Sequence, residues 1–235
     1  MNSLHVRDLG LIDYGEALAL QRDLRERRLA GEARDTLLLL EHPPTFTLGR
    51  RSTGEDFLAA PELLRERGFA VYAVERGGRT TYHGPGQLVG YPIVDVRALG
   101  FSLPQFVHAL EQCLLDYLAE LGIQAGRRTG YPGVWAGRRK IGAIGVHLKR
   151  WVSIHGFALN LRPDLAHFDA IVPCGIPDAR ATSVLAKLGG CPSMASAKTS
   201  VAERFRQVLG YEALCWDLSA PAAGVPAGTA RTAAG

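Results

Sequence analysis

A glycine-rich polar stretch near the middle of the chain constrains the fold more than any other segment. Two apolar runs flank it, at residues 69–74 and 88–96, and their composition predicts two buried strands. The stretch itself, residues 76–87, holds four glycines among seven side chains that can form hydrogen bonds. Glycine tolerates positive φ and lets a backbone come close to a ligand. We therefore expect a binding loop held between two strands.

The loop differs from the common phosphate-binding motifs. A Walker A loop ends in Gly-Lys-Ser/Thr and opens a helix, and that tripeptide is absent here. Residues 84–90, Gly-Pro-Gly-Gln-Leu-Val-Gly, miss the spacing of the dinucleotide fingerprint by one residue and lead into a strand. A tight hairpin connection with incidental polar side chains is the alternative that the residues leave open.

Length and composition predict an ordinary globular domain. The 235 residues are 47% apolar and 21% charged, which is enough to bury a core without disulfides. The longest apolar block, near residues 37–40, has the length of a strand rather than of a membrane helix. The N-terminal residues lack the pattern of a signal peptide. We expect a cytoplasmic protein that does not enter a membrane.

Positive charge favours an acidic partner. The formal net charge is +4, and arginines cluster at residues 22–28, 50–51, 127–128 and 138–139. No helix-turn-helix, zinc finger or aromatic stacking motif accompanies them, so nucleic acid is not expected. The cluster at 22–28 fits either a solvated helix face or a docking surface.

Four scattered cysteines form no Cys-x-x-Cys pair, so we expect free thiols and no structural zinc: Cys113, Cys174, Cys191 and Cys215. Cys174 is the candidate nucleophile, because its Pro-Cys-Gly setting lies off any apolar stripe. A nearby cation lowers the pKa of a thiol and raises its thiolate fraction. Lys140, at the start of a glycine-bearing apolar run, is the candidate cation. The residues alone also allow an inert cysteine and a solvated lysine.

Capping residues and periodicity predict helices at residues 13–29, 61–67, 102–121, 182–188 and 200–210. Besides the two runs beside the loop, strands are expected at residues 4–9, 35–41, 133–136, 140–147, 150–161 and 214–218. Gly142 and Gly145 weaken their strand unless something approaches the backbone closely. Pro92 predicts an edge position or a bulge. Cys215 is expected to be buried in the last strand.

The loop and the strand after it fit a specific pattern. Arg-Gly-Gly-x-x-Thr-Tyr-His-x-x-Gly-Gln-x-x-x-Tyr spans residues 76–91. In this pattern the chain resembles the lipoyl(octanoyl) transferases, which move an octanoyl group from acyl carrier protein to a lysine of a lipoyl domain. Segments 41–49, 140–145, 155–160 and 173–175 are similar to that family in order and spacing, so the resemblance covers about residues 5–210.

The resemblance implies an α/β single domain with a mixed β-sheet flanked by helices, similar to the biotin/lipoate protein ligase catalytic fold. The domain is expected at residues 1–217, with a disordered Ala/Gly/Pro tail at 218–235. The resemblance also implies catalysis without cofactor or metal. Cys174 takes the octanoyl group as a thioester, and Lys140 activates the thiol and serves as acid and base. His83 and His155 are then expected to be structural or to orient the ligand.

Three segments match those that line the acyl and pantetheine site of the family. Their residues are Arg76, Gly77, Gly78, Arg79, Thr80, Thr81, Tyr82, His83, Ala143, Ile144, Gly145, Gly156, Phe157 and Ala158. The implied donor is octanoyl-acyl carrier protein. The implied acceptors are the lipoyl domains of 2-oxoacid dehydrogenases and the glycine cleavage H protein. We expect a monomer.

Three other functions fit parts of the sequence. A lipoate- or biotin-protein ligase would form an adenylate and need an ATP site, without a nucleophilic cysteine. An amidotransferase would take octanoyl from one lipoyl-type protein and give it to another. A non-catalytic basic module would bind the carrier alone, and the helix at 13–29 would dock it through Arg25 and Arg28.

Overall fold

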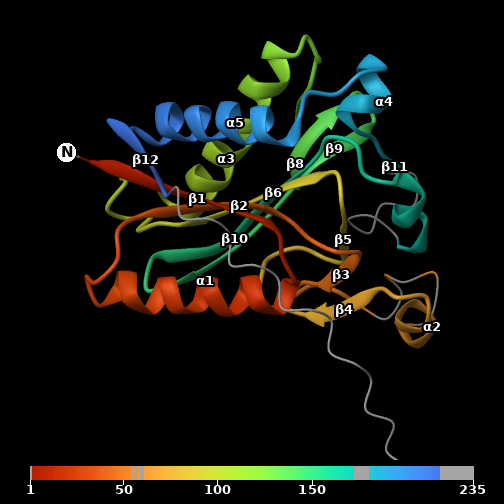
Figure 1. Ribbon diagram of the computed structural model, residues 1–235, viewed down its shortest axis with the longest axis horizontal. Coiled ribbons are helices and arrows are strands. Elements are labelled where there is room, and N and C mark those ends of the chain that lie inside the picture. Colours follow the sequence, from red (N-terminus) through yellow and green to blue (C-terminus); the bar gives the residue numbers. More distant parts are fainter. Residues whose placement is uncertain (1, 54–55, 57, 59–60, 172–179, 218–235) are drawn as a thin grey trace, which may run out of the picture.

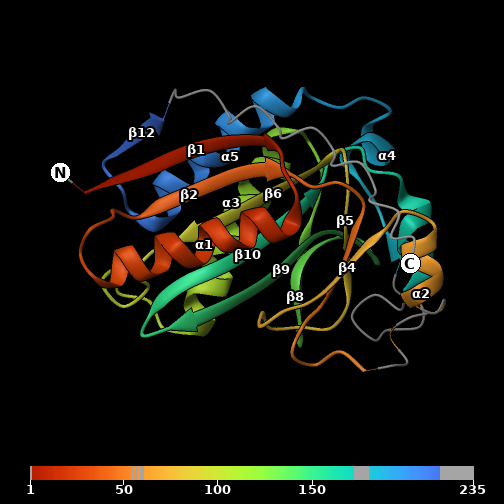
Figure 2. The ribbon, with the colours of Figure 1, turned by 60° about the horizontal axis from the view of Figure 1, so that its bottom comes forward.

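The computed structural model describes residues 2–53, 56, 58, 61–171 and 180–217 (Figure 1). These residues form a large sheet with helices on both faces and a small sheet beside one end of it (Figures 1 and 2). Cys174 and the expected tail at 218–235 lie outside the described residues. No helix within the described ranges is both long and apolar enough to cross a bilayer.

The large sheet, here the main sheet, contains nine strands among the described residues, in the order β12-β1-β2-β6-β10-β9-β8-β7, with β11 paired to β9. The strands are β1 (Ser3–Leu11), β2 (Thr36–Glu41), β6 (Gln87–Ile93), β7 (Gly126–Arg128), β8 (Tyr131–Ala136), β9 (Arg139–Lys149), β10 (Val152–Asn160), β11 (Arg180–Ala181) and β12 (Ala213–Asp217). β1 is parallel to β2 and β12, whereas β2, β6, β10, β9 and β8 are successively antiparallel. The direction is therefore mixed, as expected.

The small sheet has the order β4-β3-β5 and consists of β3 (Thr45–Leu48), β4 (Ala70–Ala73) and β5 (Thr81–His83). The helices are α1 (Tyr14–Leu29), α2 (Pro61–Glu66), α3 (Leu103–Glu120), α4 (Val184–Leu188) and α5 (Met194–Leu209), with a 3₁₀ helix, η2 (Leu165–Ala170). In Figure 1, α1 lies on one face of the main sheet and α3 and α5 lie on the other.

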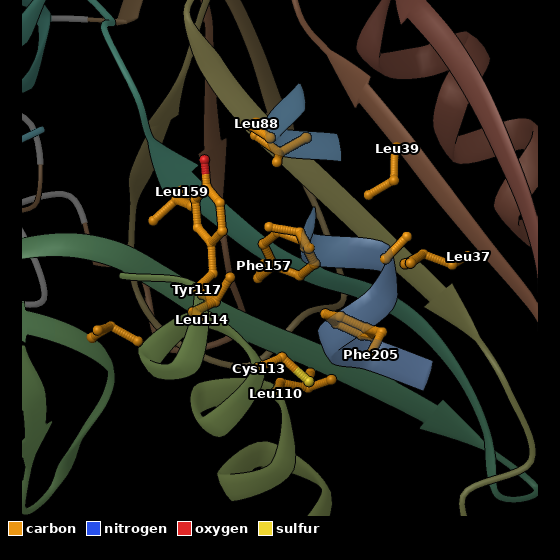
Figure 3. Packing of buried hydrophobic residues seen from close by; sticks show 14 of the residues in the cluster. Leu37, Leu39, Leu88, Leu110, Cys113, Leu114, Tyr117, Phe157, Leu159 and Phe205 are labelled. Carbon is orange, nitrogen blue, oxygen red and sulfur yellow. The ribbon is translucent and has the colours of Figure 1, made fainter. Parts of the chain in front are cut away.

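The continuous apolar run of β2 is explained by this layering. Leu37 and Leu39 belong to the core cluster under α3 and α5, whereas Leu38 and Leu40 belong to the cluster under α1. All four side chains are completely buried. Figure 3 shows the first cluster, in which Phe157 of β10 lies between the leucines and the side chains of α3. A strand covered on both faces has no polar face, so it does not alternate.

Two long helices begin where the sequence predicts, and one does not. Gln105 Oε1 accepts from the Ser102 amide of α3 at 2.9 Å, and Asp13 Oδ1 accepts from Gly15 N in α1 at 2.7 Å. The expected start of α5 at Ser200 is wrong. The helix begins at Met194, because Ser193 Oγ accepts from Ser196 N at 3.1 Å and caps it earlier.

Two burial predictions are also wrong. The run at 69–74 forms β4, a partly exposed edge strand of the small sheet, instead of a buried strand. Phe69 and Val71 pack on the cluster that contains Phe46, and Tyr72 on the other face lies 5.1 Å from the Tyr14 ring, so both faces are only partly covered. Cys215 is exposed, because β12 is the outer strand of the main sheet and pairs there with β1.

Pro92 lies in a central strand, so its expected edge position is wrong. β6 pairs with β2 on one side and β10 on the other, and its register against β10 has no bulge over residues 87–90. Next to Pro92 side chains replace ladder bonds, and backbone bonding resumes where Ser153 N donates to Val94 O at 3.0 Å. Ser153 Oγ donates to Pro92 O at 2.6 Å, and the amide of His155 donates to Gln21 Oε1 at 2.7 Å. Proline is tolerated in the centre because these side chains satisfy the neighbouring backbone groups.

Gly156 in β10 is required by the same crowding. A Cβ at this position would lie 2.2 Å from Gly90 O and 2.6 Å from Pro92 Cδ. We predict that Gly156→Ala lowers the free energy of unfolding by about 2 kcal/mol or more, because backbone atoms must move to admit the methyl group. Urea denaturation measures the change.

Gly126→Ala is the matched control for this prediction. A Cβ at Gly126 meets no atom within 4 Å, and its φ is not positive. Equal stability of the two variants would contradict the crowding of β6 against β10.

Candidate functional site

A cavity of about 640 Å³ opens between the glycine-rich loop and strands β9 and β10 of the main sheet. Thirteen of the fourteen predicted binding residues line it, and so does Lys140. They are Arg76, Gly77, Gly78, Arg79, Thr80, Thr81, His83, Ala143, Ile144, Gly145, Gly156, Phe157 and Ala158. The structure thus brings three separate sequence segments together around one cavity. Their role in binding stays a prediction.

Arg76 holds the loop in shape. Its guanidinium is buried, and it donates to Thr47 O at 2.7 Å, to Arg79 O at 2.8 Å and to Gly77 O at 3.0 Å. Thr47 belongs to β3, so the same side chain joins the loop to the small sheet. Each of these bonds carries the strength of a charged donor. Arg76 is therefore part of the cavity wall and also supports it through contacts with its own loop.

The loop docks directly on β9. Gly77 N donates to Val146 O at 3.0 Å, and a Cβ at Gly145 would lie 2.8 Å from Gly77 O. The glycine inside the strand was expected to admit a close approach. The approaching group is the backbone of the loop.

Tyr82 is the predicted binding residue that does not line the cavity. Its ring is buried in the core of the small sheet beside Phe46 and Phe168. Its hydroxyl lies 2.7 Å from His167 Nδ1. A Cβ at Gly84 would lie 2.0 Å from that hydroxyl oxygen, so the glycine leaves room for the ring. Successive strand residues point to opposite faces, which directs Tyr82 away from the cavity.

Lys140 lies on the cavity wall at the start of β9. Its Nζ is 5.4 Å from the centre of the Trp135 ring, which faces it across the β8–β9 pair, within the range of a cation–π contact. The stem packs over Gly133, where a Cβ would lie 2.5 Å from Lys140 Cε. Gly133 has a φ of 127°, and its amide donates to Glu111 Oε1 at 2.9 Å. Glu111 of α3 thus fixes the surface under the lysine.

The segment that contains Cys174, residues 172–179, lies outside the described residues, but both of its flanks reach the cavity. Ile171 before it and Ala181 after it line the wall. Ala181 pairs with Lys140 in the β11–β9 ladder, and Thr182 N donates to Lys140 O at 2.9 Å. The chain therefore leaves the described structure and returns to it beside the same cavity.

Aromatic and imidazole rings form a buried group at the cavity and behind it. Tyr14, Tyr91, His83 and His155 line the cavity, and His42 lies behind them. His42 is held by Ile12 O and the Tyr91 hydroxyl, both at 2.8 Å, as expected of a histidine that serves hydrogen bonding. The sequence analysis missed Tyr14 and Tyr91 as wall residues, although Tyr91 closes the loop pattern.

Burial sets the protonation of these groups. It lowers the pKa of His42 to about 4, and it lowers the pKa values of His83 and His155 as well. Burial also raises the pKa of Tyr14 to about 12. All of them are neutral at pH 7, so they act there as hydrogen-bonding groups. No cluster of three or more potential metal ligands occurs among the described residues.

The arginines of α1 are not an open basic face. Arg22 forms an ion pair with Glu75 at 3.0 Å, and Arg28 forms one with Asp35 at 2.7 Å. The side chain of Arg25 is only 10% exposed. The side chains of Arg25 and Arg28, expected to dock a carrier, are therefore largely occupied by intramolecular contacts, whereas Arg22 and Arg27 are each 50% exposed, as expected of a solvated face.

The chain is similar to known proteins in sequence and in fold. The model of the lipoyl protein ligase A/B catalytic domain matches residues 13–206. An octanoyltransferase of Solibacter usitatus (strain Ellin6076) is 46% identical over 214 residues, which are 91% of this chain and 96% of that protein.

Two solved structures show the same fold at low sequence identity. A bi-partite lipoate protein ligase from Thermoplasma acidophilum has a TM-score of 0.70 at 14% identity, covering 92% of this chain and 86% of that chain. A biotin protein ligase from Aquifex aeolicus has a TM-score of 0.55 at 16% identity, covering 89% and 71%. These likenesses confirm the expected fold.

The buried histidines predict a loss of stability in mild acid. Because the pKa of His42 is about 4 when folded and about 6.5 when unfolded, the unfolded chain binds more protons between these values. The contribution is complete above about pH 6.5 and is lost as the pH falls toward about 4, by up to about 3 kcal/mol. Denaturation in urea from pH 7 to pH 5 should show a smaller pH slope for His42→Gln than for the wild type.

His108→Gln, at an exposed position of α3, is the control for the change of residue type. If both variants keep the slope of the wild type, the burial of His42 does not govern the acid response.

Proposed function

Because the chain belongs to the octanoyltransferase family, we propose that it moves an octanoyl group from octanoyl-acyl carrier protein, through a thioester on Cys174, to a lysine of a lipoyl domain. The observation that carries this proposal is the convergence at one cavity. Lys140, the glycine-rich loop and both flanks of residues 172–179 meet there.

Covalent geometry supports the pairing of Cys174 with Lys140. Cys174 follows Ile171 by three residues, and a chain spans at most about 3.5 Å per residue, roughly 10 Å here. Ile171 lines the cavity, and Ala181 on the other flank pairs with Lys140. The thiol is thus tethered within reach of the cavity that Lys140 borders. An ammonium group in that setting lowers the pKa of a thiol.

The reaction has two half-reactions. In the first, the Cys174 thiolate attacks the thioester carbonyl, a new carbon–sulfur bond forms, and the bond to the carrier sulfur breaks. Lys140 gives its proton to the departing carrier thiolate. In the second, the amine of the lipoyl-domain lysine attacks the enzyme thioester, and Cys174 leaves as a thiolate. Neutral Lys140 accepts the proton that the amine loses, which restores the starting pair.

The energetics of this sequence need no nucleotide. Exchange between two thioesters is nearly balanced, and transfer from a thioester to an amine is downhill. The cavity volume of about 640 Å³ lies in the usual range for small-molecule sites. Ile144 and Phe157 supply apolar wall for an acyl chain. We propose catalysis without cofactor or metal.

The same proposal includes the acceptor proteins, the cellular location and the oligomeric state. The acceptors are the lipoyl domains of 2-oxoacid dehydrogenases and the glycine cleavage H protein. The enzyme acts as a cytoplasmic monomer, and residues 1–217 form its catalytic domain. A ligase that activates free acid with ATP is the main alternative, because the solved structures of similar fold include ligases.

Intact-mass measurement tests the covalent intermediate. Wild-type protein mixed with octanoyl-acyl carrier protein, without ATP, should gain one octanoyl group that hydroxylamine removes. Cys174→Ser should gain none. Lys140→Ala should acylate about 100-fold more slowly, because it lacks the group that stabilises the thiolate and moves the proton.

A different pattern would support the ligase. If the wild type forms no adduct and a lipoyl domain is modified only when ATP and free octanoate are supplied, the transferase proposal fails. An adduct on Cys174→Ser that neutral hydroxylamine still removes would show that another cysteine carries the acyl group, because an ester on the introduced serine resists this treatment.

A further inference from the structure

A chain of buried hydrogen bonds links the glycine-rich loop to the strand that carries Lys140. His83 Nδ1 lies 2.8 Å from Gln87 Oε1, and Gln87 Nε2 donates to Asn160 Oδ1 at 2.9 Å. Asn160 Nδ2 donates to Thr182 O at 2.9 Å. The chain ends where Thr182 N donates to Lys140 O at 2.9 Å.

The links are shielded from water. Gln87, Asn160 and Thr182 are exposed by 2%, 5% and 1%. A buried polar group that loses its partner keeps its desolvation penalty, about 1–3 kcal/mol. The bonds also point in one direction, and hydrogen bonds in such a series polarise one another. Removing one of these hydrogen bonds is therefore expected to weaken the others in the series.

The partners fix how each amide is turned. Gln87 Nε2 faces two acceptors, Tyr82 O at 3.2 Å and Asn160 Oδ1, so its oxygen faces His83. Neutral His83 can donate from Nδ1 to that oxygen. Asn160 must then direct its oxygen to Gln87 and its NH₂ group to Thr182 O. One arrangement satisfies the whole series.

Asn160 closes a gap in the main sheet. β10 pairs with β9 as far as Leu159, which lies opposite Gly142. Beyond it, β11 pairs with β9 at Lys140. β11 has only two residues, and a strand pair this short does little to specify its own register. The amide of Asn160, at the end of β10, reaches the residue that follows β11 and ties the two strands together.

We propose that Asn160 is a positioning residue, which holds Thr182 against Lys140 and thereby sets β11 at the level of the lysine. Gln87 supports it by fixing the orientation of its amide. This inference rests on the proposed function, in which Lys140 acts on Cys174. Asn160 would set the position of Lys140 relative to β11, the strand that follows the segment containing Cys174. Asn160 also lines the cavity, but in this role it acts through Thr182 and not on a reacting atom.

Asn160→Asp tests the role at constant size. The carboxylate presents an oxygen to Thr182 O, so the bond is replaced by repulsion. We expect octanoylation of Cys174 by octanoyl-acyl carrier protein to slow 10- to 100-fold in kcat, with KM changed less than twofold. The rate of Cys174 alkylation by iodoacetamide against pH should show a thiol pKa raised toward the ordinary value of about 8.5. Asn2→Asp, the same change at an exposed position, is the control and should match the wild type.

The outcomes separate this inference from the proposed function. If the wild type forms no adduct on Cys174, the proposed function fails. If the wild type reacts and folded Asn160→Asp has the same kcat and the same Cys174 thiol pKa as the wild type, the positioning role is overturned. A variant in which only KM rises overturns it as well.

Asn160→Ala covers the case in which the carboxylate prevents folding, because it removes the amide without adding charge. The same fall in kcat and rise in thiol pKa support the role. Wild-type values in this variant, or unfolding of both variants in thermal melts, would assign the amide to stability alone and overturn it.

Discussion

The shape of the cavity depends on the hydrogen bonds that the buried guanidinium of Arg76 donates to backbone carbonyls. A charge removed from water is tolerated only when its donors are satisfied, and here carbonyls of the loop and of β3 accept them. The loop must therefore curl around the side chain that belongs to it. The wall of the cavity is the outer surface of this curl. A residue that looks from the sequence like a ligand contact is largely the internal support of the binding loop.

A second constraint is the close packing of backbone against backbone at glycine residues. The loop rests on β9 through Gly77 and Val146, and Gly145 leaves space for it. Within the main sheet, Gly156 lets β10 approach Gly90 and Pro92 of β6. Each glycine removes a side chain where two backbones meet. The loop and the strands can therefore pack backbone to backbone beside the cavity.

Charge is distributed unevenly around the cavity. Burial keeps the nearby histidines neutral, so they form hydrogen bonds and add no positive charge to the cavity wall. Lys140 lies apart from them, over the Trp135 ring and beside β11. Lys140 and the neutral histidines therefore occupy different parts of one cavity. Of the arginines of α1, Arg28 pairs with Asp35, whereas Arg22 pairs with Glu75, whose carboxylate lies 3.6 Å from His155 Nε2 at the cavity.

The sequence by itself determined the elements whose signal is local. Capping residues marked α1 and α3, the four leucines of β2 marked a strand, and the loop pattern marked the family. Tertiary structure decided what depends on neighbours: that the run at 69–74 is a partly exposed edge, that Cys215 faces solvent, and that Ser153 and Gln21 allow Pro92 in a central strand. It also turned Tyr82 away from the cavity and joined Gln87 to Asn160 across 73 positions of sequence. Burial and long-range hydrogen bonds are properties of pairs of distant residues, and periodicity within one segment carries no information about the partner.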